Sequence, residues 1–451
     1  MRRSTYTALL YILSPFILLF VALRIIRAPD YRDRWYQRFG FGFGSPQIQP
    51  CIWVHAVSVG EVSAATPLVR RLLEDCPDCR IILTTVTTTG YERARAVFGD
   101  RVRHAYLPLD FPGAVRRFLR HFQPELAVIM ETELWYNLFY TCAKRGVPLV
   151  IANARISPRS LKGYRQWRRT VGRVLNYINF AGAQTEQDAE RLRELGLPAD
   201  RIAVTGNLKF DIPVGTDARE QGEALRRSWG PQRPVWVAAS THEGEDELVL
   251  DAFSEVRRRI PDALLILVPR HPQRFDAVAA LIRQRGFSMA RRKQGQVPDY
   301  KTAVYLGDTM GELMRFYAAA DVAFVGGSLV PIGGHNLLEP AALGVPTVTG
   351  PHTFNFSEIY RSLREAGGVI TVEGSESLAA EVAEVTRNKA RRESVGSAAQ
   401  GMVQRNQGAL ERMYGWLQPY LRSVVTESSS LAVATAGRVP TKSEDAQSTK
   451  I

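Results

Sequence analysis

The chain has 451 residues, of which 45% are hydrophobic and 23% charged, and its 58 Lys and Arg exceed its 45 Asp and Glu. This length is too great for one ordinary domain, and the composition excludes a largely disordered chain, so we expect two globular domains with additional segments. The net charge of +13 indicates an anionic partner: nucleic acid, anionic lipid or a phosphorylated substrate.

The first 28 residues contain an apolar stretch from Ala8 to Leu23, interrupted only by Ser14 and Pro15. Its length is at the lower end for a spanning helix, so a signal anchor that spans, a helix that enters one leaflet and a cleaved signal peptide are alternatives. Arginines instead of small residues follow it, which argues against cleavage. Because basic residues after the stretch outnumber those before it, we expect a membrane anchor over residues 1–28, with the folded part on the cytoplasmic face of the inner membrane.

The four cysteines, Cys51, Cys76, Cys79 and Cys142, are too few for a disulfide framework and suit a reducing compartment. Cys76 and Cys79 have the spacing of a zinc knuckle, but no second pair completes a set of four ligands. We therefore expect no metal site.

Short runs rich in β-branched residues alternate with helical stretches in two series. The runs begin at Ile52, Arg80, Leu126, Pro148 and Ile202, and then at Pro234, Ala263, Ala303, Val322 and Val345. This alternation predicts βαβ units around parallel sheets, with ligands at the carboxyl ends of the strands. A polar stretch from Asp211 to Pro234 separates the series. We predict Rossmann-like domains over residues 29–215 and 216–423 that face a central cleft, and a disordered tail over 424–451.

The most specific local pattern is GGSLVPIGGHNLLEPAALGVPTVTGP, which begins at Gly326. It predicts a strand, a glycine-rich loop and a helix starting near Gly334, whose free N–H groups suit a phosphate. Glu339 could accept two ribose hydroxyls near the same place. The alternative is a glycine-rich turn with a purely structural role.

Other polar residues also follow predicted strands. Thr309 and Glu312 have capping-box spacing, and Arg270 could bind two phosphate oxygens. The segment 240–246 lacks HExxH spacing, so we expect it to cap a helix and line a ligand site without binding metal. Ser58 and Glu61 also match a capping box, which leaves two roles for Glu61: a helix cap, or a general base that deprotonates an acceptor hydroxyl.

A basic segment lies between Glu133 and Glu186, which contains no acidic residue. It holds nine cations: Lys144, Arg145, Arg155, Arg159, Lys162, Arg165, Arg168, Arg169 and Arg173. Lys162, Arg165 and Arg169 are predicted to share one helical face, near Tyr164 and Trp167. Such a face suits phosphates at a lipid headgroup surface, and a solvated helix face is the alternative.

Eight motifs occur together in order: WVHAVSVGE, ETELWYN, NARIS, GNLKFD, AASTHEGED, LVPRHPQRF, DTMGEL and GGHNLLEPAALGVPTVTGPHTFNF. From about Trp35 to Leu421 the chain resembles the 3-deoxy-D-manno-octulosonic acid (Kdo) transferases of Gram-negative bacteria. The resemblance implies a GT-B fold, and an inverting transfer of Kdo from CMP-Kdo to the lipid A precursor, lipid IVA, without metal or cofactor. It also accounts for the positive charge without nucleic acid.

The resemblance assigns roles to particular residues. It implies that Glu61 is the proton acceptor and that Glu131 and Lys209 stabilise charge. It places CMP against Pro269, Arg270, Met310, Gly311, Glu312, Asn336, Leu337, Leu338 and Glu339. The basic surface of Arg155, Lys162, Arg165 and Arg169 would meet acceptor phosphates. Two alternatives remain: a nucleotide-sugar 2-epimerase of the same architecture, and a non-catalytic lipid-binding protein.

Overall fold

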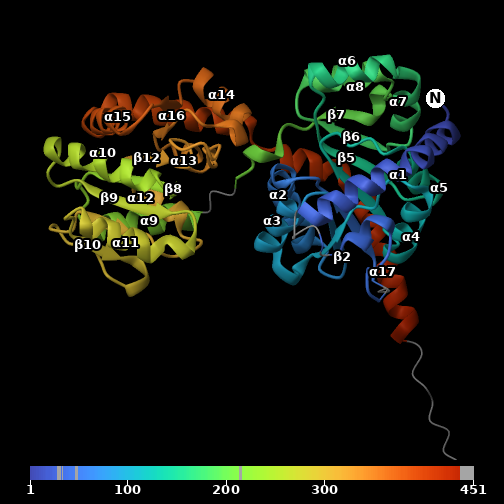
Figure 1. Ribbon diagram of the computed structural model, residues 1–451, viewed down its shortest axis with the longest axis horizontal. Coiled ribbons are helices and arrows are strands. Elements are labelled where there is room, and N and C mark those ends of the chain that lie inside the picture. The colour runs from blue at the N-terminus through green and yellow to red at the C-terminus, as the bar shows by residue number, and fades with distance from the viewer. Residues whose placement is uncertain (28–31, 33, 46–48, 213–215, 437–451) are drawn as a thin grey trace, which may run out of the picture. The chain divides into compact units, whose positions relative to one another are not determined.

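The computed structural model describes residues 1–27, 32, 34–45, 49–212 and 216–436 (Figure 1). The chain divides into two compact units. One unit combines Met1–Asp211 with the segment from Gly408, and the other is Ile212–Gln407. The predicted domain boundaries at 28/29 and 215/216 touch residues outside the described ranges.

The first unit is a seven-stranded, wholly parallel sheet in the order β3-β2-β1-β4-β5-β6-β7. Its strands are β1 (Cys51–His55), β2 (Arg80–Thr85), β3 (Arg103–Tyr106), β4 (Leu126–Met130), β5 (Leu149–Ala154), β6 (Phe180–Ala183) and β7 (Ile202–Val204). The order reverses between β1 and β4, and ligands of such sheets bind outside the carboxyl ends at that point.

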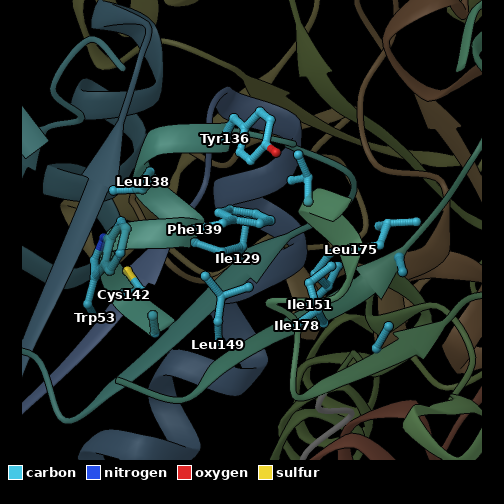
Figure 2. Close-up of a cluster of buried hydrophobic side chains, with 14 of the residues drawn as sticks. Trp53, Ile129, Tyr136, Leu138, Phe139, Cys142, Leu149, Ile151, Leu175 and Ile178 are labelled. Atoms are coloured by element: carbon cyan, nitrogen blue, oxygen red, sulfur yellow. The ribbon is translucent and has the colours of Figure 1, made fainter. Parts of the chain in front are cut away.

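Helices cover both faces of this sheet. They are α1 (Arg3–Arg27), η2 (Trp35–Phe39), α2 (Val59–Asp75), α3 (Thr88–Phe98), η3 (Gly99–Arg101), α4 (Pro112–Phe122), α5 (Tyr136–Lys144), α6 (Pro158–Gln166), α7 (Arg168–Leu175), α8 (Glu186–Leu195), η4 (Ala199–Arg201), η5 (Leu208–Phe210) and α17 (Ala409–Ala436). Figure 2 shows the core on one face, where Phe139 and Cys142 of α5 pack over Trp53, Ile129 and Ile151 of the strands.

The second unit is another parallel sheet, in the order β10-β11-β9-β8-β12-β13-β14. Its strands are β8 (Val235–Thr241), β9 (Leu264–Pro269), β10 (Met289–Arg291), β11 (Val304–Leu306), β12 (Val322–Val325), β13 (Thr347–Thr349) and β14 (Val369–Thr371). Its helices are α9 (Thr216–Trp229), α10 (Glu245–Arg259), η6 (Pro272–Arg274), α11 (Phe275–Gln284), η7 (Arg292–Gln294), α12 (Leu313–Ala319), α13 (Leu338–Leu343), η8 (Phe354–Phe356), α14 (Ser357–Glu365), α15 (Ser375–Arg387) and α16 (Lys389–Asn406).

All ten predicted strands are present, and the prediction of two Rossmann-like units is confirmed. Two details of the organisation differ. The polar stretch expected to be only a linker contains α9, which packs against α12. The predicted cleft between the two units stays a prediction.

The prediction that the C-terminal segment belongs to the second domain and then becomes disordered is wrong. Residues 408–423 were predicted in the second domain, but they belong to the first unit, and the helix extends to Ala436 through part of the predicted disordered tail. The reason is an apolar face at helical spacing that joins the core of the first unit: Ala409, Met413, Leu417, Leu421 and Val424. Residues 437–451 of the predicted tail lie outside the described part of the chain.

Candidate functional site

Glu61 lies in the first turn of α2, directly after β1, with 9% of its surface exposed. Its Oε2 accepts a hydrogen bond from the backbone N–H of Val57 at 2.8 Å. Ser58 makes no side-chain cap, so the predicted reciprocal capping box does not form. Glu61 therefore stabilises the turn after β1 through one hydrogen bond to Oε2. Its other carboxylate oxygen, Oε1, is left for other chemistry.

Burial raises the pKa of Glu61 from 4.5 to about 8. The bond from Val57 opposes this rise, the negative charges of Glu131 and Glu133 add to it, and Lys209 lowers it. The N-terminal position in α2 favours an ionised carboxylate, but desolvation by burial outweighs it. A pKa near 8 suits a group that takes up a proton near neutral pH.

Glu131 and Lys209 form an ion pair beside Glu61, with 3.4 Å between Nζ and Oε1. Glu131 directly follows β4, the strand next to β1 at the reversal of strand order, and its backbone is left-handed at φ 56°. A non-glycine residue in this region is strained, and such strain is typical of functional sites. The structure thus brings together all three predicted catalytic residues.

Two asparagines that were not among the predicted site residues hold the backbone around Lys209 in place. Asn153, buried at the end of β5, accepts a hydrogen bond from Leu208 N at 3.0 Å, and Asn207 accepts one from Lys209 N at 3.0 Å. Asn153 is also left-handed, at φ 58°. Its place in the motif NARIS was visible in the sequence, but its contact with the distant turn at Lys209 was not.

The second unit has its own polar edge. Arg270 follows β9, and its guanidinium makes no hydrogen bond or ion pair with the described residues. His242, after β8, and His335 place their Nε2 atoms 2.8 Å apart, with stacked rings. Burial and neighbouring cations lower the pKa of His242 to about 4 and that of His335 to about 3, so both rings are neutral near pH 7. Arg270 therefore carries a guanidinium that no described side chain occupies and that can bind an anion here.

The glycine-rich segment differs from its prediction. The helix begins at Leu338 instead of Gly334, and the N–H of Gly334 donates to Gly327 O at 2.7 Å. The side chains of Leu337 and Leu338 are buried, so only their backbones could contact a ligand. Asn336 accepts from Leu338 N and donates to Glu339, each at 3.2 Å. The polar groups of this segment are thus arranged by Asn336 more than by a helix start.

A buried carboxylate that we assigned to helix capping supports this loop. Glu245 accepts hydrogen bonds from the N–H groups of Gly327, Ser328 and Leu329, at 2.6, 3.1 and 2.9 Å. A Cβ on Gly326 would lie 2.7 Å from the Glu245 carboxylate, which explains that glycine by packing. Glu245 therefore stabilises the turn after β12 by accepting hydrogen bonds from its backbone N–H groups.

The segment Met310–Glu312 presents a mixed surface. Met310 is exposed, Gly311 has φ +81°, and Glu312 pairs with Arg292 and Arg315 at 2.8 and 2.6 Å. These contacts lower the pKa of Glu312. Thr309 donates to the Glu312 carboxylate, but the predicted capping box is wrong, because α12 begins at Leu313 and Glu312 is the residue before it, with no side-chain cap.

The two units match separate family models: residues 33–212 match "3-Deoxy-D-manno-octulosonic-acid transferase (kdotransferase)", and residues 236–402 match "Glycosyl transferases group 1". The chain is 45% identical over 424 residues to the 3-deoxy-D-manno-octulosonic acid transferase of Haemophilus influenzae, covering 93% of this chain and 99% of that one. It is 37% identical to the enzyme of the same name from Bordetella pertussis, covering 93% and 100%.

The chain belongs to the Kdo transferase family.

As a Kdo transferase it is a glycosyltransferase with the GT-B fold. The fold is also found in a UDP-GlcNAc 2-epimerase from Neisseria meningitidis, with a TM-score of 0.50 and 13% identity over 82% of this chain and 100% of that one. Likeness at this level reflects fold alone. The alternative of a 2-epimerase therefore draws no support from it.

The basic surface of this Kdo transferase departs from its prediction. We expected one helix here, but the backbone breaks at Trp167 and forms two, α6 and α7. Lys162 and Arg169 therefore lie on different helices and do not share one helical face. Arg165 pairs with Glu194 of α8, at 2.5 and 2.9 Å. The basic segment contains no acidic residue, but Glu194 from outside it neutralises the charge of Arg165. Lys162, Arg169 and Arg155 remain exposed.

Proposed function

We propose that this Kdo transferase moves Kdo from CMP-Kdo to a lipid A precursor, lipid IVA, in lipopolysaccharide biosynthesis, with inversion at the anomeric carbon. The observation that carries the proposal is the buried carboxylate of Glu61 beside the Glu131–Lys209 ion pair, at the reversal point of the first sheet. A group with a pKa of about 8 at that point is suited to deprotonate an acceptor hydroxyl.

In the proposed reaction, Glu61 takes the proton of the acceptor hydroxyl as that oxygen attacks the anomeric carbon. The bond from this carbon to the CMP phosphate breaks, and its electron pair leaves with CMP. CMP needs no proton to leave, so one base is enough, and a single displacement inverts the configuration. The proton stays on Glu61 until solvent removes it.

Lys209 has a separate role in this proposal. Its ammonium offsets the negative charge of the donor carboxylate or of the departing phosphate, and the ion pair with Glu131 directs it. Asn153 and Asn207 restrict the backbone that carries Lys209. This arrangement keeps the cation in place before substrate arrives.

The donor is proposed to bind the second unit. Arg270 would hold a phosphate oxygen, the backbones of Pro269, Gly311, Leu337 and Leu338 would contact the nucleotide, and Glu339 would accept ribose hydroxyls. Met310, Glu312 and Asn336 would complete the site. The acceptor phosphates would meet Lys162, Arg169 and Arg155, with Arg165 contributing less because Glu194 neutralises it.

The deciding experiment incubates the full-length protein with CMP-Kdo and tetra-acylated lipid A precursor. We expect release of CMP that depends on the acceptor, and a lipid product heavier by one or more Kdo residues in mass spectrometry. Glu61→Gln should abolish this, whereas Glu74→Gln, an exposed acid at the far end of the same helix, should not. Absence of CMP release by the wild-type protein would refute the proposal. Epimerisation of a soluble nucleotide sugar would favour the epimerase.

A further inference from the structure

The first turns of α1 are bound to the folded part of the first unit by polar contacts. The amino group of Met1 donates to Thr170 Oγ1 at 2.6 Å. Arg3 and Thr7 both donate to Asn137 Oδ1, at 3.2 and 2.9 Å. The start of the apolar helix is therefore attached to α5 and α7 of the globular unit.

Aromatic side chains extend this attachment. The Tyr6 hydroxyl donates to the buried carboxylate of Asp110, and its ring lies 5.6 Å from that of Tyr136. Tyr11 lies 5.4 Å from Phe111. Because Asp110 and Asn137 are buried core residues, the contact is part of the fold and not an incidental surface contact.

The remainder of α1 is apolar and mostly exposed, although Val21 is buried. The segment Arg3–Leu23 is strongly apolar, with a mean hydropathy of 2.2 over its most apolar stretch. Only 6% of the residues in that stretch are buried. The exposed apolar side chains are Leu9, Ile12, Leu13, Phe16, Leu18, Leu19, Phe20, Leu23 and Ile26. Neighbours such as Ile12 and Leu13, or Leu18 to Phe20, point to different sides of the helix. A second copy of the chain would cover one stripe, whereas hydrocarbon would cover all of them.

The position of Met1 restricts how hydrocarbon can cover this helix. A helix of 25 residues is about 37 Å long, and the apolar layer of a bilayer is about 30 Å thick. If α1 crossed the bilayer, Met1 would be separated from Thr170 by that layer. In the structure the two are hydrogen-bonded, and α1 runs across the first unit (Figure 1).

We propose that α1 enters one leaflet of an anionic bilayer without crossing it, so that both of its ends remain on the side of the folded units. Arg2 precedes the apolar stretch, and Arg24 and Arg27 follow it, which places cations for anionic headgroups at both ends of the sequence of α1. The proposal goes beyond the transfer reaction and does not depend on it.

Cysteine labelling in sealed membranes tests this topology, because all four native cysteines are buried. Ser4→Cys lies on the exposed side of the first turn, and Ser397→Cys on an exposed position of α16 marks the side of the folded units. We expect a membrane-impermeant maleimide to label both from the same side, in inverted vesicles and not in intact cells. Labelling of Ser4→Cys from the side opposite to Ser397→Cys would overturn the proposal.

A second variant tests the occupant. Ile12→Cys, at an exposed position of the helix body, should react with a lipid-soluble maleimide and resist the impermeant one from both sides. Reaction with the impermeant reagent would show that lipid does not cover the helix. A disulfide between two copies of Ile12→Cys on mild oxidation would identify a second chain as the occupant. Either result would overturn the proposal, whatever the transfer activity.

Discussion

Glu61 combines two properties that usually oppose each other, since it is a buried acid and also a proposed base. Because its pKa is about 8, most of it is protonated at pH 7, and only the ionised fraction can accept a proton. We predict that kcat/KM rises with pH by up to about tenfold per unit below pH 8 and levels off above it. Glu131→Gln should shift this midpoint to lower pH, since a neighbouring negative charge is removed. A flat profile between pH 6 and 9 would contradict the assignment.

The same pKa has an effect on stability. The folded protein holds a proton on Glu61 between pH 4.5 and 8 that the unfolded chain has released, so this contribution to stability declines as pH rises through that window. Glu61→Gln removes this dependence. We predict that the mutant gains stability over wild type as pH rises from 4.5 to 8, by at most about 1.4 kcal/mol per pH unit, and that the gain is constant above pH 8. Urea unfolding at several pH values measures it, and Glu74→Gln should follow wild type.

At the scale of elements, the turn after β12 depends on Glu245 of α10. Its carboxylate accepts several backbone N–H groups, and an amide in its place would direct N–H groups at some of those donors. We predict that Glu245→Gln raises the KM for CMP-Kdo several-fold with a smaller change in kcat, because the donor segment loosens while Glu61 is untouched. Steady-state kinetics measures this, and the control is Glu243→Gln, an exposed acid two residues after the end of β8 at Thr241. An unchanged KM would refute this role.

Elements also differ in how well their sequences predict them. The central strands were predictable because they are continuous apolar runs, as expected for strands buried on both faces. β3, β6, β10 and β14 were not predicted. Length alone does not explain this, since β7, β11 and β13 have only three residues each. β3 contains Arg103 and His104, β10 ends with Arg291, and β6 has no β-branched residue, so these strands lack the apolar β-branched pattern. The partner of Arg165 lies on α8, 29 residues further along the chain, so no local pattern shows this contact.

At the scale of the molecule, α17 connects the end of the chain to the first unit. Leu417 is fully buried in that core, and Trp416 stacks on Phe180 with ring centroids 4.4 Å apart. We predict that Leu417→Ala destabilises the first unit by about 2–5 kcal/mol and leaves the second unchanged. Hydrogen exchange should rise in β1 and β4 and stay constant in β8 and β12. The exposed neighbour substitution Gln418→Ala should alter neither unit.

The candidate site was predictable to the extent that its residues follow strands. Glu61, Glu131 and Arg270 each come directly after a predicted strand, and the carboxyl ends of parallel strands share one edge. Asn153 and the pairing of His242 with His335 could not be predicted, since their contacts join segments 55 and 93 residues apart. The domain of α17 was missed for the same reason.

Asp211, the last residue of the first unit before the chain leaves it, accepts the backbone N–H of Gly408, where the chain returns, at 2.7 Å. During synthesis the ribosome therefore releases the sheet of the first unit long before the helix that completes its core. The second unit can fold in that interval, while the first still exposes the surface that α17 will cover. A nascent chain stalled before Gly408 should bind chaperones, and completion of translation should release it.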